Sequence, residues 1–138
     1  VFSIGEREFF DDYAHHPTEI KSVLKSLKTT SNNRRIVSVF QPHRYSRLRL
    51  LKKDFSYAFK DSDLVLLCPV YPAGEKIDKK YKEVDFARLI FRNSKAQVVI
   101  VRNQHDLKKF FIKNLLENEI IVCMGAGSIS KWIREMDL

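Results

Sequence analysis

The clearest indication of the fold lies near the end of the sequence, in the run Ile120-Ile121-Val122-Cys123-Met124-Gly125-Ala126-Gly127-Ser128-Ile129. Its first half is a continuous apolar run, which predicts a strand buried on both faces, as in a parallel sheet. The two glycines that follow permit a tight turn. A helical pattern of apolar residues then extends from residue 129 to residue 136. Strand, glycine turn and helix together form one βα unit.

The same alternation of strand and helix recurs along the whole chain. Strands are predicted at residues 7–10, 35–40, 64–70, 97–101 and 120–124. Helices are predicted from about Pro17 onward and at residues 46–59, 84–91, 107–116 and 129–136, with Asp106 and Ser128 as N-caps of the last two. Such alternation predicts one doubly wound α/β domain over residues 1–138, a mostly parallel sheet with helices on both faces.

Length and composition are those of one globular domain. The chain has 138 residues, of which 44% are hydrophobic and 30% charged. It has no signal peptide, and no run approaches the roughly 20 apolar residues of a membrane span, so we expect a cytoplasmic protein without membrane contact. Because it begins at Val1, it is expected to be a piece of a longer chain. Cys68 and Cys123 lie in apolar runs, which favours buried thiols over a disulfide.

The net charge of +8 raises the possibility of nucleic-acid binding. The lysines and arginines are spread over most predicted helices, however, and none of the common nucleic-acid-binding signatures occurs. A generally basic surface, or attraction for phosphorylated small molecules, accounts for the charge equally well. No nucleic-acid partner is therefore expected.

Polar residues gather where predicted strands end and helices begin, in segments 11–19, 41–47, 70–75 and 125–128. Ligands of open α/β sheets bind at that edge, whereas the opposite turns carry ordinary solvated residues. The first segment permits either a capped helix start or a metal site at Asp12, His15 and His16. Adjacent histidines rarely face one metal, so no metal ligand is predicted.

Three potential cations, His43, Arg44 and Arg47, lie within one turn of a predicted helix start. A helix N-terminus already favours anions, so such a cluster is better explained by a bound anion than by helix stability. A solvated basic face is the alternative. The glycine turn is not an ATP-binding P-loop, since G-x-x-x-x-G-K-[ST] occurs nowhere in the sequence.

These motifs resemble the C-terminal domain of the Mur ligases. The run Asp11-Asp12-Tyr13-Ala14-His15-His16-Pro17-Thr18-Glu19-Ile20 is similar to the signature that opens this domain in the ligases adding L-alanine to UDP-N-acetylmuramate. Three further runs resemble later blocks of the family in the same order: Phe40-Gln41-Pro42-His43-Arg44-Tyr45-Ser46-Arg47, Tyr71-Pro72-Ala73-Gly74-Glu75 and Met124-Gly125-Ala126-Gly127-Ser128-Ile129. The sequence departs from the family between Glu75 and Phe86, where lysines replace small residues.

The resemblance implies a three-domain, ATP-dependent ligase of peptidoglycan biosynthesis. The first domain would hold UDP-N-acetylmuramate, the central domain would hold most of the ATP and Mg²⁺, and this third domain would close over both. The reaction implied is amide formation with L-alanine through an acyl phosphate. The other domains of the same polypeptide would be its partners, and alone it should be inactive.

Matching to the family motif also implies roles for single residues. Asp12 would contact the ATP ribose, His15 would face the γ-phosphate and the alanine, and Tyr13 would shape the amino-acid pocket. His16 and Thr18 would position the loop and cap the helix.

The basic cluster would bind an anion of the reaction. Arg44 and Arg47, with His43, would bind the alanine carboxylate or the transferred phosphate. His15, Arg44 and Arg47 are the catalytic candidates. The alternative is a stand-alone nucleotide- or anion-binding module without catalysis; a nucleic-acid-binding domain ranks last.

Overall fold

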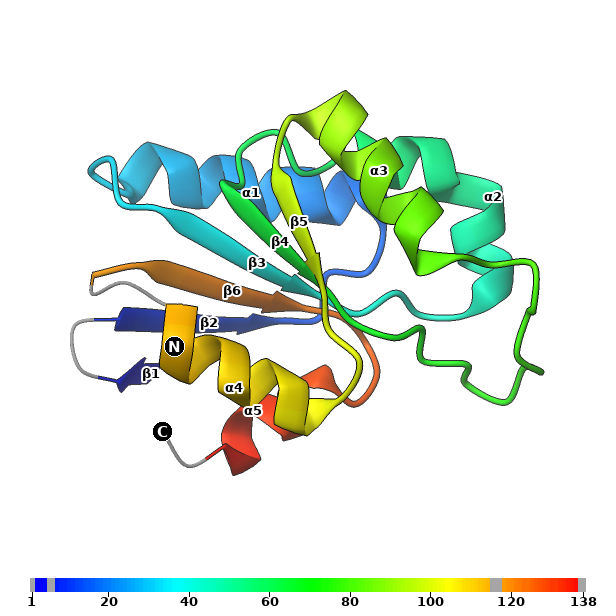
Figure 1. Cartoon of the computed structure of the whole chain (residues 1–138). Helices are drawn as coiled ribbons and strands as arrows, with labels where there is room; N and C mark the ends of the chain where they lie inside the picture. The colour runs from blue at the N-terminus through cyan, green and yellow to red at the C-terminus, as the bar shows by residue number, and fades with distance from the viewer. Residues whose placement is uncertain (1, 5–6, 115–117, 137–138) are drawn as a thin grey trace.

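A six-stranded sheet forms the centre of the molecule, a computed structural model that describes residues 2–4, 7–114 and 118–136 (Figure 1). The strand order is β1-β2-β6-β3-β4-β5. Strands β2 to β6 are parallel, and β1 runs antiparallel to β2. The strands are β1 (Phe2–Ile4), β2 (Arg7–Asp12), β3 (Ile36–Phe40), β4 (Leu64–Leu67), β5 (Gln97–Ile100) and β6 (Ile120–Met124).

Helices cover both faces of the sheet (Figure 1). The helices of the described residues are α1 (Pro17–Thr30), α2 (Tyr45–Ser56), α3 (Glu83–Ser94), α4 (Gln104–Asn114) and α5 (Ile129–Glu135). Helices α1, α2 and α3 lie on one face, and α4 and α5 lie on the other. The predicted doubly wound, mostly parallel α/β fold is confirmed. None of the helices in the described part of the chain is long and apolar enough to cross a bilayer.

Two apolar clusters, one on each face of the sheet, hold the layers together. On the face of α1 to α3, the ring of Phe40 lies between those of Phe55 and Phe59, with centroid distances of 5.5 and 5.3 Å. On the other face, Phe9 of β2 meets Phe111 of α4 edge to face at 5.8 Å. The buried strands are thus apolar on both sides, as their continuous apolar runs predicted.

The structure corrects several predicted boundaries. Strand β1 was missed because three residues are too few to show a period. Strand β4 ends at Leu67 and not at residue 70, because Pro69 cannot donate to a ladder. Helix α2 ends at Ser56 and not at residue 59, after a kink at Leu51, whose backbone is not helical. The predicted end of the fourth helix, at residue 116, lies outside the described residues.

One predicted N-cap, Ser128, is confirmed in position, and the other, Asp106, is wrong. Helix α4 begins before Asp106, whose N–H donates to the side chain of Asn103 at 2.8 Å. Ser128 occupies the cap position of α5 but makes no side-chain cap bond. The two cysteines are buried and free, as predicted. Burial raises the pKa of the Cys68 thiol, which therefore stays protonated.

Candidate functional site

The four polar segments meet at one edge of the sheet because β2, β6, β3 and β4 are neighbours whose carboxyl ends point the same way. Backbone hydrogen bonds join the segments directly. The N–H of Gly125 donates to the Asp12 carbonyl at 3.4 Å, and the N–H of Arg44 donates to the Tyr71 carbonyl at 2.8 Å. The predicted location of the site is therefore a real meeting point of four loops.

The first segment is fixed by the start of α1. His16 is the N-cap: its Nδ1 accepts from the Thr18 N–H at 3.3 Å, and its own N–H donates to Glu19 at 3.1 Å. This capping box, with Pro17 in the first turn, holds the loop in one conformation. His15 can therefore be presented from a rigid element, while the ring of His16 is engaged in capping, as expected for a structural residue.

Three rings from three loops come together at the centre of the site. His43 stacks on Tyr71 with a centroid distance of 5.6 Å, and His15 lies 6.0 Å from His43. Burial and the neighbouring charge of Arg47 lower the pKa of His43. His43 is therefore neutral near pH 7, and its buried Nδ1 has no partner among the described residues. This leaves a hydrogen-bonding atom directed at no protein group.

Arg47 lies on the first turns of α2 and, like His43, has a buried side-chain nitrogen without a hydrogen-bond partner among the described residues. Its Nη1 is buried and has no hydrogen-bond partner in the described part of the chain. No carboxylate pairs with it there. The residue as a whole is half-buried, but a buried guanidinium nitrogen without a hydrogen-bond acceptor is unfavourable unless a ligand supplies one. We expect an anionic ligand group at this position.

Arg44 has a strained backbone at the start of α2. Its φ is 70° and its ψ is 132°, a conformation that a non-glycine residue rarely adopts. Nearby, Glu75 accepts hydrogen bonds from both the N–H and the hydroxyl of Ser46, and this hydroxyl lowers the pKa of Glu75. A strained backbone such as that of Arg44 persists where surrounding contacts impose it, often at ligand sites.

Gln41 connects the second segment to the glycine turn. Its side chain is almost fully buried; Nε2 donates to the Ser128 hydroxyl, and Oε1 accepts from the Ile129 N–H, both at 3.0 Å. Gly127 packs so closely here that a Cβ would come within 2.4 Å of the Tyr71 ring and 2.8 Å of Gln41 Oε1. The glycine turn therefore serves close packing beneath the site.

Replacing Gln41 with leucine should lower the free energy of unfolding by about 1–3 kcal/mol, because the buried Ile129 N–H loses its acceptor. Urea denaturation followed by circular dichroism measures the change. Gln97, an exposed glutamine on β5, provides the matched Gln→Leu control and should change stability by less than about 0.5 kcal/mol. Equal stabilities of the two variants would contradict the role of Gln41.

Asp12 and Tyr13 lie on the other side of the glycine turn. Asp12 Oδ1 accepts from the Ala14 N–H at 2.8 Å, while its second carboxylate oxygen has no hydrogen-bond partner among the described residues. Tyr13 is 69% exposed and borders a hollow of about 410 Å³. The other lining residues of this hollow are Gly127, Ser130, Lys131, Arg134 and Glu135.

The structure thus groups the predicted residues into two sets. His15, Arg44 and Arg47 form one around the ring of His43. Tyr13 faces the hollow beside α5, and Asp12 lies where the two sets meet. Over the described ranges, no group of three His, Cys, Asp or Glu residues could hold a metal ion.

Sequence reasoning missed two residues of the site. Tyr71 forms the aromatic wall behind His43, and Gln41 holds the glycine turn. Both belong to segments that were recognised as chemically rich. Their position at the end of a strand was the available signal, but a single stacking or amide contact leaves no spacing pattern to detect.

Comparison with known proteins identifies relatives over almost the whole chain. Residues 2–127 match the family model described as Mur ligase, glutamate ligase domain. The chain is 47% identical over 136 residues to the UDP-N-acetylmuramate–L-alanine ligase of Pelagibacter ubique, covering 99% of this chain and 29% of that protein. It is 42% identical over 124 residues to the corresponding ligase of Brachyspira hyodysenteriae, covering 90% and 27%.

Solved structures of Mur ligases superpose on this chain. The UDP-N-acetylmuramate–alanine ligase of Thermotoga maritima superposes with a TM-score of 0.66 at 28% identity, over 96% of this chain and 27% of that one. A murein peptide ligase of Psychrobacter arcticus has a TM-score of 0.75 at 18% identity, covering 97% and 27%, and shows a shared fold. The chain spans less than a third of the length of the curated relatives named above.

Proposed function

The chain belongs to the Mur ligase family, as a C-terminal glutamate ligase domain, and we propose on this premise that it is the third domain of an ATP-dependent ligase joining L-alanine to UDP-N-acetylmuramate. The choice of L-alanine rests on the relatives, which are ligases for that amino acid. One observation in the structure supports a role in the reaction itself: the buried, unpaired Nη1 of Arg47 beside the neutral ring of His43.

The proposed reaction has two steps. An oxygen of the muramate carboxylate attacks the γ-phosphorus of ATP, ADP leaves, and an acyl phosphate forms. The alanine amine then attacks the acyl carbon, the bond from that carbon to the phosphate oxygen breaks, and inorganic phosphate leaves while the amine loses a proton. Negative charge is present on the phosphoryl oxygens and on the alanine carboxylate throughout. A site for this chemistry therefore needs fixed cations.

Arg47 and Arg44 supply such cations in the proposal. A guanidinium can bind a carboxylate or a phosphate through two parallel hydrogen bonds. Because Arg47 is half-buried on a helix, it would be held in place before the charge develops, and such preorganised donors give the largest electrostatic effect. His43 and His15 would complete the wall of the site with ring nitrogens that can form hydrogen bonds.

Asp12 remains our proposed contact for the ATP ribose, because its second carboxylate oxygen is available to accept from a hydroxyl. Tyr13 lies beside the hollow of α5, so the amino-acid pocket proposed for it would have to reach across the glycine turn. The described residues contain no group of three His, Cys, Asp or Glu side chains that fits a metal ion, so Mg²⁺ would be held by the rest of the ligase.

A chimeric ligase tests the proposed function. In it, this chain replaces the matching C-terminal part of the Pelagibacter ubique ligase, which is 47% identical to it. With ATP, Mg²⁺ and UDP-N-acetylmuramate, phosphate release should depend on L-alanine, and glycine or serine should support it less well. Discrimination of about 10–200-fold is the range expected for one methyl or hydroxyl group. A folded chimera that releases no phosphate with any amino acid would contradict the proposal.

The isolated 138-residue chain should release no phosphate and should bind ATP too weakly to saturate below about 1 mM. Most phosphate contacts belong to the central domain in this proposal, and no P-loop occurs in the sequence. Isothermal titration calorimetry measures the affinity. Micromolar ATP binding by the isolated chain would instead favour the stand-alone nucleotide-binding module.

A further inference from the structure

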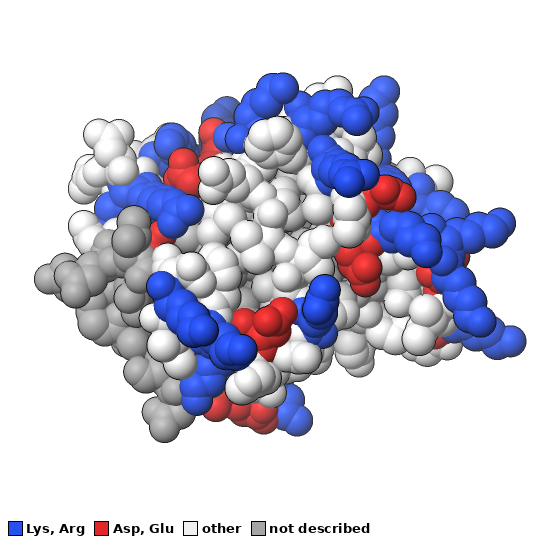
Figure 2. Space-filling view, viewed as in Figure 1, with Lys and Arg blue, Asp and Glu red and all other residues white. Residues whose placement is uncertain are grey.

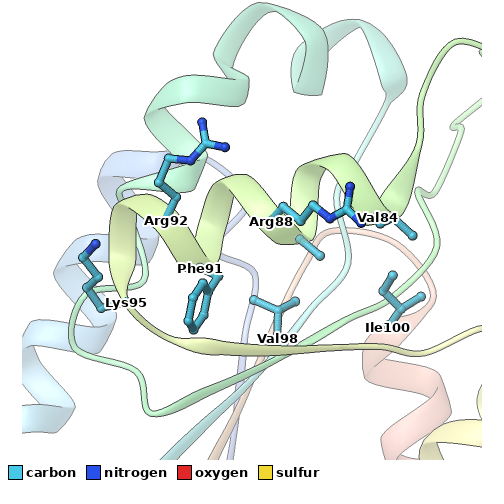
Figure 3. A pocket seen from close by; sticks show the side chains of 8 residues that line it. Val84, Arg88, Phe91, Arg92, Lys95, Val98 and Ile100 are labelled. Atoms are coloured by element: carbon cyan, nitrogen blue, oxygen red, sulfur yellow. The ribbon is translucent and has the colours of Figure 1, made fainter.

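A groove that shares no lining residue with the candidate site runs between α3 and the edge strand β5 (Figure 3). Its volume is about 630 Å³, and its apolar lining comes from Val84, Phe91, Val98 and Ile100. Phe91 is 56% exposed and Val84 is 48% exposed. The side chains of Phe91 and Val98 lie close to each other between helix and strand in Figure 3. An exposed aromatic ring over an apolar floor is typical of an interaction surface.

The strand beside this groove has a free edge. Strand β5 pairs only with β4 among the described strands. The N–H groups of Gln97 and Val101 donate toward β4, to the carbonyls of Asp63 and Leu67. Because backbone groups alternate along a strand, the N–H and C=O of Val98 and Ile100 point away from the sheet. These groups can pair with an added strand.

The rim of the groove is basic. Arg88, Arg92 and Lys95 line it, and none of the three takes part in an ion pair within the described part of the chain. Figure 2 shows an uncharged area over β5, bordered by many Lys and Arg side chains and by a smaller number of Asp and Glu side chains. The acidic residues of α3 are confined to its first turn. The rim therefore presents three cations that form no ion pair with a carboxylate of the described residues.

We propose that this groove binds an extended acidic segment of a partner protein, which adds a strand to the free edge of β5. Backbone hydrogen bonds to Val98 and Ile100 would supply the affinity. Apolar side chains would pack on Phe91, and carboxylates would meet the basic rim. A second copy of the chain fits poorly, because each copy carries a net charge of +8 and the same basic rim.

A labelled heptapeptide serves as the probe. The sequence Asp-Thr-Val-Thr-Ile-Thr-Glu forms strands readily and places its acidic and apolar side chains on one face. Fluorescence anisotropy with the 138-residue chain should show saturable binding with a Kd below about 1 mM. The charge-reversed peptide Lys-Thr-Val-Thr-Ile-Thr-Lys should bind at least about tenfold more weakly.

Two variants separate strand addition from general attraction. Arg88→Glu with Arg92→Glu should weaken peptide binding at least about tenfold, since attraction becomes repulsion. Val98→Pro removes one outward N–H and leaves the bonds to β4, and should weaken binding about fivefold. Lys21→Glu with Lys25→Glu, at exposed positions on α1, makes the same change in net charge and should leave binding unchanged.

Circular dichroism is to be used to check that each variant is folded. The charge variants test the proposal even if Val98→Pro does not fold. Loss of binding in the groove variants with unchanged binding in the α1 variant supports the site. An equal loss in the α1 variant would show attraction to the overall charge and would overturn the proposal. Failure of the acidic peptide to bind, or equal binding of its charge-reversed form, would overturn it as well.

Discussion

Replacing Arg47 with alanine should lower kcat of the chimeric ligase by about 100–1,000-fold, the usual effect of removing one preorganised donor from a developing negative charge. Arg47 is singled out because its Nη1 is buried and unpaired among the described residues. Its guanidinium therefore makes no contact at Nη1 that would stabilise the fold. The alanine variant should for this reason lose activity mainly in the chemical step. Steady-state phosphate release with saturating ATP, UDP-N-acetylmuramate and L-alanine measures it.

Arg49 gives a matched control on the same helix. Its side chain is 70% exposed and lies 3.9 Å from the Asp78 carboxylate, so alanine there should change kcat less than about twofold. The isolated Arg47→Ala domain should unfold at about the same urea concentration as the parent, because the half-buried Arg47 side chain has an Nη1 without a hydrogen-bond partner among the described residues. An active Arg47→Ala chimera would refute the catalytic role.

Replacing Phe40 with alanine should lower the free energy of unfolding by about 3–5 kcal/mol, the cost of deleting a fully buried aromatic side chain. Phe40 is 0% exposed and packs between Phe55 and Phe59, so the deletion leaves a cavity between β3 and α2. The loss is comparable with the whole stability of many domains. Urea denaturation of the isolated domain measures the change in the free energy of unfolding. A lower yield of soluble Phe40→Ala domain on expression would be a second indication of lost stability.

The control for this variant is another phenylalanine. Phe91 on α3 is 56% exposed, so alanine at that position should change stability by less than about 1 kcal/mol. A Phe40→Ala domain as stable as the Phe91→Ala domain would mean that β3 does not pack on α2 as described.

The fold was largely predictable because its strands are buried on both faces. Runs such as residues 120–124 are typical of strands inside a parallel sheet, and their alternation with helical stretches leaves few topologies. Strand β1 was not predictable, since three residues show no period. The kink of α2 at Leu51 was also hidden, because every residue around it is compatible with a continuous helix.

The place of the site followed from one rule, that ligands bind at the carboxyl ends of parallel strands. The arrangement of single residues within the site was harder to predict from the sequence. His43 and Tyr71 are far apart in the sequence and stack only because β3 and β4 are neighbours. Only Ala14 separates Tyr13 from His15, yet Tyr13 borders the hollow beside α5 and His15 lies next to His43. Such directions depend on backbone geometry and not on residue type.

The central claim is that this chain acts as the closing domain of an L-alanine-adding ligase, and product formation tests it most directly. Mass spectrometry of a reaction with the chimeric ligase should detect the amide of L-alanine with UDP-N-acetylmuramate, together with ADP and phosphate in equal amounts. The N-terminal part of the Pelagibacter ligase alone should form none. Absence of the amide from a folded chimera, or phosphate release without amide, would contradict the claim.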